Sequence, residues 1–279
     1  MMDIVIGKNT LESLTTGMYS DAKIIYREYI QNSVDAIDEA IRLKMLKPEE
    51  CFIHIYIDKK NNSISFFDNG TGIKSNEAIC KLIDIGNSSK NHQVNRGFRG
   101  IGRLAGLSYC KNLTFETSYL GEDIKTVITF DAYKLSQILI PGKYEDHDLI
   151  SVIKEITNVE RMPEKKELHY FKVFLEEVDN VDNIMDYDIV KEYLCQIAPL
   201  PYNLKEFHWG KEIKEKLNLL NIDLQEYNIF LEDNNKKSKL YKIFRSNFFS
   251  GLRRKLPDRI KDIEIRLIKD EKGNIMAVI

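Results

Sequence analysis

The strongest periodic pattern in the chain lies between residues 26 and 45, YREYIQNSVDAIDEAIRLKM. Apolar side chains recur there at a helical spacing, at Ile30, Val34, Ile37 and Ile41. This spacing predicts a helix with one apolar face, which ends before Pro48. At about 100° per residue, Glu28, Asn32 and Asp35 fall together on the opposite side. Taken alone, that side is typical of a solvated polar helix face.

Strand patterns follow this helix. CFIHIYI (51–57) and SISFFD (63–68) are expected to be strands, joined by the polar turn DKKNN. A short helix is expected at 75–86 and a second helical segment at about 101–110. Further strands are expected at 112–119, 125–131 and 169–178. Strands separated by helices in this order predict an α/β layered domain.

With 279 residues, the chain is long enough for two domains. We expect the first to span 1–178 and the second to span 179–279, with a helix at 188–203 leading into it. At the C-terminal end, the turn DEKGN between two strand-like runs predicts a hairpin. Its return strand looks cut short, so we expect the second domain to be truncated and the chain to be a fragment of a longer protein.

Composition excludes several classes of protein. The formal net charge is -2, which gives the whole chain no electrostatic signature of nucleic-acid or membrane binding. The four cysteines are widely separated, and neither they nor the histidines show a metal or triad spacing. The N-terminus lacks a secretory leader pattern, and no apolar run approaches the roughly 20 residues of a membrane span. We therefore expect a cytoplasmic protein.

Two glycine-rich stretches follow the patterned segments. In FFDNGTGI (66–73), an acidic residue ends a strand and two glycines follow, which alone is a common turn signal. In NRGFRGIGRLAG (95–106), glycines precede a helical segment, a place suited to phosphate because backbone N–H groups are free there. The spacing GxxGxG matches neither the dinucleotide fingerprint nor the Walker loop.

The order ExxxNxxD, DxGxG, lid-like loop and GxxGxG resembles the Bergerat-fold (GHKL) ATPase superfamily. The segments that carry the resemblance are EYIQNSVDA, DNGTGI, IGNSSK and RGFRGIG, and it covers roughly residues 10–178. It is strongest to the heat-shock-chaperone (HATPase) branch, although RGFRG is also similar to the MutL proteins. The resemblance implies a two-layer sandwich, a mixed sheet with helices on one face, which binds ATP and Mg²⁺.

The resemblance also implies roles for the polar side of the first helix. Asn32 corresponds to the amide whose oxygen ligates Mg²⁺, a hard ion that prefers oxygen ligands. Glu28, one turn earlier, corresponds to the base that polarises a water toward the γ-phosphate. Asp35 either helps to organise the pocket or is a structural carboxylate, and these readings stand about equal.

The second motif corresponds to the adenine end of the family's pocket. Asp68 would accept a hydrogen bond from the adenine amino group. Gly70 and Gly72 would let the purine lie against backbone, and Ile73 closes the motif. Relatives usually carry a Gly-Thr pair at the start of the last strand, but this chain has Tyr170-Phe171 there, so the detailed adenine contacts are in doubt.

Residues 84–102 correspond to the family's ATP lid. Gly86 and Gly97 would act as hinges, while the segment's last residues, Gly100, Ile101 and Gly102, would present N–H groups to the phosphates. Lys90 is either a phosphate contact or a solvated loop lysine. Arg99 and Arg103 are read as ordinary charged loop residues.

The leading functional hypothesis is a Mg²⁺-dependent ATPase of heat-shock-chaperone type, with slow hydrolysis, lid closure and nucleotide-dependent homodimerisation. The first alternative is a DNA-processing ATPase of the gyrase or MutL kind, and the second is a non-hydrolysing nucleotide sensor. A histidine kinase is disfavoured because no suitable phospho-acceptor helix precedes the motifs. The basic and aromatic segment 236–261 is either an amphipathic segment with core aromatics or an interface.

Overall fold

The computed structural model describes residues 21–83, 102–140, 148–207, 209–243, 266–271, 273 and 275–278. The chain divides into two compact units. The first is made of Met1–Ala198 and Tyr227–Leu240, and the second of Pro199–Glu226 and Tyr241–Ile279. The expected boundary at residue 178 differs from this division, because the chain leaves the first unit, returns to it and leaves again.

An eight-stranded mixed sheet forms the centre of the first unit, in the order β5-β4-β3-β6-β2-β1-β7-β8. Neighbouring strands are antiparallel throughout, except that β7 runs parallel to β1. The strands are β1 (Phe52–Asp58), β2 (Ser63–Asp68), β3 (Asn112–Ser118), β4 (Ile124–Asp131), β5 (Thr157–Pro163), β6 (Tyr170–Glu176), β7 (Asn228–Asp233) and β8 (Lys237–Lys239).

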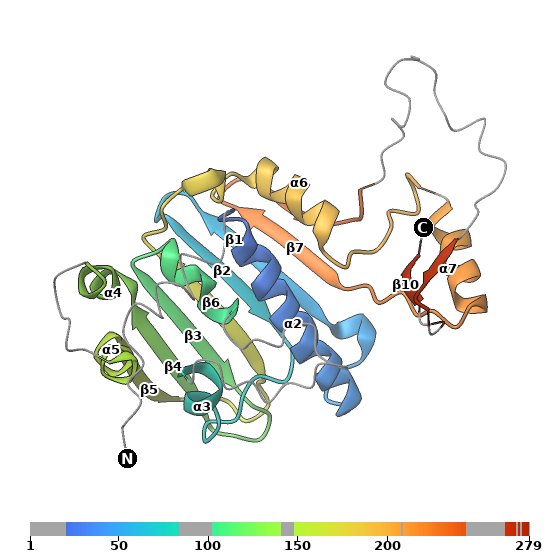
Figure 1. Ribbon diagram of the computed structural model, residues 1–279. Helices are drawn as coiled ribbons and strands as arrows, with labels where there is room; N and C mark the ends of the chain where they lie inside the picture. Colours follow the sequence, from blue (N-terminus) through green and yellow to red (C-terminus); the bar gives the residue numbers. More distant parts are fainter. Residues whose placement is uncertain are drawn as a thin grey trace. The chain divides into compact units, whose positions relative to one another are not determined.

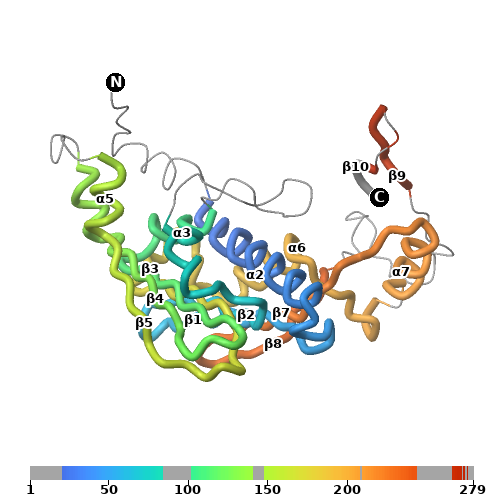
Figure 2. The backbone as a smooth tube through the Cα atoms, turned by 90° about the horizontal axis from the view of Figure 1, so that it is seen from below, coloured from blue at the N-terminus to red at the C-terminus, as the bar shows by residue number. Residues whose placement is uncertain are grey.

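Helices cover one face of this sheet (Figures 1 and 2). They are α2 (Ile24–Arg42), α3 (Ala78–Ile83), the 3₁₀ helix η2 (Gly102–Ser108), α4 (Ala132–Ile138), α5 (Leu149–Ile156) and α6 (Tyr187–Ile197). The first unit is therefore the two-layer sandwich, with a mixed sheet and helices on one face, that the sequence predicts. No described helix is long and apolar enough to cross a membrane.

The core lies between α2 and the sheet. The apolar face of α2 is buried, and Ile53, Ile55 and Ile57 of β1 are fully buried beneath the helix layer. Phe66 of β2 packs against two helix rings, with centroid distances of 5.3 Å to Tyr26 and 4.9 Å to Tyr29. Each alternate strand residue points to the helix side, so the strict period-two pattern of β1 follows directly from one-sided burial.

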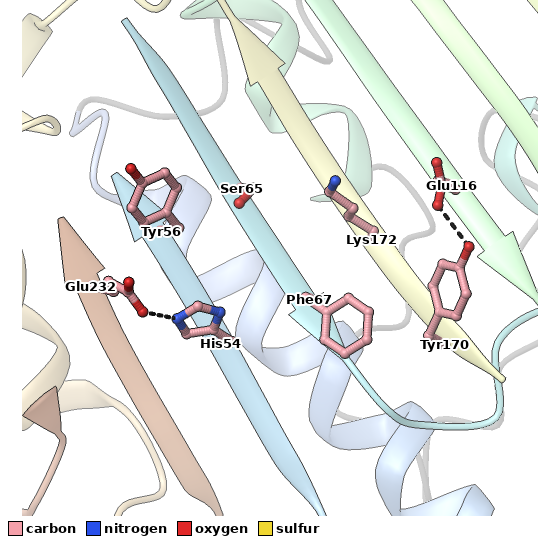
Figure 3. Close-up of a pocket in the computed structure, with 8 residues that line it drawn as sticks. All are labelled: His54, Tyr56, Ser65, Phe67, Glu116, Tyr170, Lys172 and Glu232. Carbon is pink, nitrogen blue, oxygen red and sulfur yellow. Dashed lines mark hydrogen bonds and ion pairs between the residues drawn. The ribbon is translucent and has the colours of Figure 1, made fainter. Parts of the chain in front are cut away.

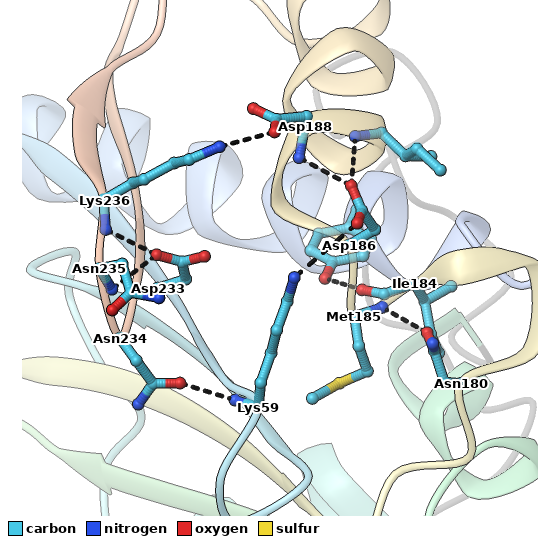
Figure 4. Close-up of polar contacts among 12 residues, drawn as sticks. Lys59, Asn180, Ile184, Met185, Asp186, Asp188, Asp233, Asn234, Asn235 and Lys236 are labelled. Carbon is cyan, nitrogen blue, oxygen red and sulfur yellow. Dashed lines mark hydrogen bonds and ion pairs between the residues drawn. The ribbon is translucent and has the colours of Figure 1, made fainter.

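The sequence analysis assigned residues 179–279 to the second domain, but two strands from this range, β7 and β8, complete the first sheet. Strand β7 lies along β1 from Phe52↔Asn228 to Ile57↔Asp233. Figure 4 shows how the β7–β8 turn is fixed: Lys236 pairs with Asp188 at 2.6 Å, and the Asn234 side chain accepts a hydrogen bond from Lys59 N at 3.0 Å. A parallel neighbour requires a long crossover, which here contains α6 and the excursion through residues 199–226.

The second unit is described by α7 (Trp209–Leu219) and by the antiparallel pair β9 (Leu267–Lys269) and β10 (Ile275–Val278). The hairpin around DEKGN is thereby confirmed. The helices α4 and α5 and the strands β5, β7 and β8 of the first unit were not predicted. The segment after Gly102 is a 3₁₀ helix rather than the expected regular helix.

Candidate functional site

The polar side of α2 borders the site on one side. Glu28, Asn32 and Asp35 are each half-buried, and each makes contacts within the protein. Asn32 follows Glu28 by about one helical turn, so their side chains project from the same flank of α2. The helix is fixed in place by its apolar face, with the Tyr26 hydroxyl donating to the carbonyl of Ile184 at 2.6 Å. The core therefore determines where these polar groups stand.

Asp68 ends β2 and faces α2 with only 1% of its surface exposed. Its Oδ1 accepts a hydrogen bond from Gly70 N at 3.0 Å, and its carboxyl group also bonds the side chain of Ser33. Burial raises the pKa of Asp68 to about 7, and these two hydrogen bonds oppose the rise. Sequence reasoning missed Ser33. The signal available was its position on α2 beside Asn32, on the side that turns toward β2.

The DNGTGI loop packs directly on α2 and on the neighbouring strands. Thr71 N donates to the carbonyl of Ala36 at 3.2 Å. A Cβ added at Gly70 would lie 2.7 Å from the carbonyl carbon of Ala36, and one at Gly72 would lie 1.9 Å from the carbonyl oxygen of Ser118. Gly72 also has a φ of +64°, in the left-handed region. Both glycines are therefore required by the fold itself.

A buried hydroxyl, that of Thr117, lies in the same cross-strand row as Asp68 but two strands away. Asp68 pairs across the sheet with Phe171, and Phe171 pairs with Thr117 of β3. Thr117 Oγ1 accepts from Ile73 N at 2.8 Å and donates to the carbonyl of Tyr170 at 3.1 Å. The Thr117 hydroxyl therefore fixes the DNGTGI loop at Ile73.

His169 also holds the DNGTGI loop in place, in addition to Thr117. Its Nδ1 lies 2.7 Å from the carbonyl oxygen of Gly70. Because a carbonyl can only accept, this ring nitrogen carries the proton. Sequence reasoning treated the histidines as structural or surface residues, and His169 acts structurally by fixing Gly70.

The start of η2 closes the site opposite the DNGTGI loop. A Cβ added at Gly102 would lie 1.9 Å from Glu28 Oε2, so the backbone of η2 begins directly against this carboxylate. Farther along η2, Gly106 N donates to the Tyr29 hydroxyl at 3.0 Å. Arg103 Nε donates to the carbonyl of Leu82 at 3.0 Å, which gives this arginine a structural partner.

The structure thus places the predicted residues in two groups along α2. Asp68, Gly70, Gly72 and Ile73 form one end, and Glu28 with Gly102 forms the other, with Asn32 and Asp35 on the helix that joins them. The remaining predicted residues, Gly86, Lys90, Gly97, Gly100 and Ile101, lie outside the described residues. Within the described part of the chain, no three His, Cys, Asp or Glu side chains are grouped as a metal site.

Comparison with known proteins gives consistent results. The model of a family described as histidine kinase-, DNA gyrase B- and HSP90-like ATPase matches residues 19–160. The chaperone protein HtpG of Buchnera aphidicola subsp. Baizongia pistaciae is 28% identical over 132 residues, which is 41% of this chain and 21% of that protein.

Longer matches are found to other HtpG proteins. The one from Wigglesworthia glossinidia brevipalpis is 25% identical over 264 residues, 81% of this chain and 40% of the relative. The one from Clostridium botulinum (strain 657 / Type Ba4) is 27% identical over 230 residues, 74% of this chain and 35% of the relative. The chain therefore spans less than half the length of these relatives.

The burial of Asp68 predicts a defined pH dependence of stability. Between about pH 4 and pH 7 the folded chain keeps a proton that the unfolded chain has released, so raising the pH lowers the stability of the wild type. Asp68→Asn has no such proton. Its stability relative to the wild type should rise across this window, by at most about 1.4 kcal/mol per pH unit, and then stay constant. Urea unfolding at several pH values measures this, with the exposed Asp123→Asn variant as control. A difference in unfolding free energy between Asp68→Asn and the wild type that does not change with pH would contradict the prediction.

Two glycines with positive φ provide a matched test of the loop packing. Gly121 has a φ of +90° and open space around its Cβ position, whereas the Cβ position of Gly72 is occupied by Ser118 O. Gly121→Ala should cost about 1 kcal/mol from backbone strain alone. Gly72→Ala should cost about 3 kcal/mol or more, because a backbone atom must also move. Equal losses in chemical denaturation would show that the loop does not pack as described.

Proposed function

Because this chain belongs to the family of histidine kinase-, DNA gyrase B- and HSP90-like ATPases, we propose that it binds Mg²⁺-ATP beside α2 and hydrolyses it slowly. Its similarity to HtpG chaperones favours a chaperone-like ATPase module. One observation carries the proposal: a buried carboxylate, Asp68, held by Ser33 and Gly70, lies at one end of a site whose other end is a second carboxylate, Glu28, against the glycine start of η2.

At the Asp68 end, the chemistry suits an adenine ring. A carboxylate is an acceptor, and the exocyclic amino group of adenine is a donor. Ser33 and Gly70 N hold the Asp68 carboxyl group in one orientation, so its acceptor direction is set before a ligand arrives. Thr117 and His169 fix the loop that would lie along the ring. This end would therefore select adenine over a base that presents an acceptor at the same position.

At the Glu28 end, the groups suit a polyphosphate. Glu28 would hold and polarise the attacking water, and Gly102, at the start of η2, would let backbone approach the phosphates closely. Asn32 would offer an amide oxygen to Mg²⁺, with water and phosphate oxygens as the other ligands. When bound, the ion would neutralise charge on the phosphoryl groups. Asp35 would support the pocket from the same helix flank.

The finer functional proposals rest on the resemblance of the motifs. Residues 84–102 would close over the nucleotide as a lid, with Lys90, Gly97, Gly100 and Ile101 near the phosphates. Closure would promote a nucleotide-dependent homodimer and transmit the nucleotide state to an attached or partner domain in the cytoplasm. Sedimentation analysis with and without a non-hydrolysable ATP analogue tests dimerisation, and a monomer under both conditions would remove that part of the proposal.

The two helix residues should separate binding from hydrolysis. Glu28→Ala should keep Mg²⁺-ATP binding and lose at least about 100-fold in turnover, because only the base is removed. Asn32→Ala should instead weaken binding in the presence of Mg²⁺. Calorimetry and steady-state phosphate release measure the two effects. Glu39→Ala, on the same flank of the helix about three turns from Glu28 and paired with Arg42, is the matched control. Wild-type turnover by Glu28→Ala would exclude Glu28 as the base.

Asp68→Asn should abolish nucleotide binding while the protein stays folded. The amide replaces an acceptor with a group that can present a donor to the adenine amino group, which leaves buried polar atoms unpaired. ATP titration by calorimetry decides this, with Asp58→Asn, at the other end of the same hairpin, as control. An affinity within threefold of the wild type would make Asp68 a turn residue only.

The alternatives give different results in the same assays. A DNA-processing ATPase would show salt-sensitive DNA binding, and a nucleotide sensor would bind ATP tightly without releasing phosphate. The net charge of -2 and the HtpG relatives favour the chaperone-like reading.

A further inference from the structure

The face of the sheet opposite α2 contains a depression of about 570 Å³. Its lining residues come from five strands, and none of the described helices of the first unit lies over it (Figures 2 and 3). They are His54, Tyr56, Ser65, Phe67, Glu116, Tyr170, Lys172 and Glu232. The depression is separated from the α2 site by the thickness of the sheet.

A single small residue among large ones creates the hollow. Ser65 pairs across the sheet with Tyr56, and His54 pairs with Phe67. The rings of these three neighbours therefore surround the small Ser65 side chain, which forms the bottom of the depression (Figure 3). Among the described residues, the Ser65 hydroxyl has no hydrogen-bond partner. The position would be filled by any larger side chain, so the choice of serine keeps the hollow open.

The aromatic wall of the hollow is held by stacking. The Phe67 ring stacks on Tyr170 at 5.5 Å between centroids and on Phe52 at 5.7 Å, both with interplanar angles of 25°. The Tyr170 hydroxyl donates to Glu116 at 2.7 Å and to Glu164 at 3.0 Å. The wall is therefore a fixed, largely apolar surface suited to a planar ring.

One cation in the depression has no ion-pair partner among the described residues. The two lining carboxylates already have cations: Glu116 has Lys125 at 3.2 Å, and Glu232 has Lys237 at 2.6 Å as well as the His54 ring. The Lys172 ammonium lies 5.4 Å from the centre of the Phe174 ring, and no carboxylate of the described residues pairs with it. Lys172 lies opposite Glu116 across β3 and β6 without forming an ion pair with it, so its ammonium is a cation beside the aromatic wall.

We propose that this depression binds a planar aromatic anion, with the ring between Tyr56 and Phe67 above Ser65 and the anionic group on Lys172. The aromatic wall supplies the contact area, and the ammonium selects the sign of the charge. A neutral or cationic ring of the same size gains the stacking but not the ion pair. The site does not depend on the proposed ATP chemistry, because its residues lie on the other face of the sheet.

The probes are naphthoate and its cationic counterpart naphthylmethylammonium, titrated into the isotopically labelled full chain and followed by amide NMR shifts. Naphthoate should give saturable shifts in β1, β2 and β6 and bind about fivefold tighter than the cation. Equal binding of the two ions, or no saturable shifts in these strands, would overturn the proposal. Saturable naphthoate shifts centred on α2 and η2 would also overturn it, since the ligand would then occupy the α2 site.

Variants separate charge from shape. Lys172→Gln should weaken naphthoate about fivefold and Lys172→Arg should retain it, whereas Lys134→Gln, on α4, should have no effect. Ser65→Phe should remove binding by filling the floor, while Val127→Phe adds the same ring elsewhere on this face and should not. Unchanged naphthoate affinity in Lys172→Gln or in folded Ser65→Phe would contradict the proposal. Naphthoate binding by a chain that does not bind ATP would leave this inference intact and refute only the proposed function.

Discussion

The packing of α2 against the central strands is the interaction on which the rest of the first unit depends. Phe66 locks between Tyr26 and Tyr29, and the DNGTGI loop bonds the helix backbone at Ala36. This contact buries Asp68 next to Ser33 and aims the opposite flank of the helix, with Glu28, toward the start of η2. One apolar interface therefore sets both ends of the site, although none of its apolar residues has a chemical role.

Burial of Asp68 lowers the stability of the fold, but it holds the carboxyl group in one orientation as a hydrogen-bond acceptor. A carboxyl group with 1% exposure is desolvated, and the two hydrogen bonds that it receives compensate only in part, so its pKa stays near 7. Perturbed carboxylates of this kind gather at functional sites. The glycines beside it have no room for side chains, which means that the loop can adopt this path only where the sequence supplies Gly70 and Gly72.

Much of this arrangement could be predicted from local sequence. The helical period of residues 26–45, the alternation in β1 and β2 and the acid-glycine order of DNGTGI each report a local preference that tertiary packing reinforces. The contacts of Ser33, Thr117 and His169 could not be predicted, because they join residues from different elements. Nothing in the residues near Thr117 indicates that strand β3 would bring it to Ile73.

The expected domain boundary at residue 178 differs from the observed division for a related reason. Strand β7 has the alternation of any half-buried strand, and its place beside β1 is decided by pairing with a segment about 175 residues earlier. The sequence predicted a second domain from residue 179, whereas the second unit begins at Pro199, and sequence alone gave no sign that the chain would return at Tyr227. Long-range strand pairing is the level of structure that local patterns do not encode.

The most direct test of the central claim is a crystal structure of this chain with Mg²⁺ and a non-hydrolysable ATP analogue. The account predicts the adenine amino group within hydrogen-bonding distance of Asp68, the metal ion at the Asn32 amide oxygen and the terminal phosphate facing Glu28. A nucleotide bound on the other face of the sheet, or bound beside α2 with its base away from Asp68, would contradict the account.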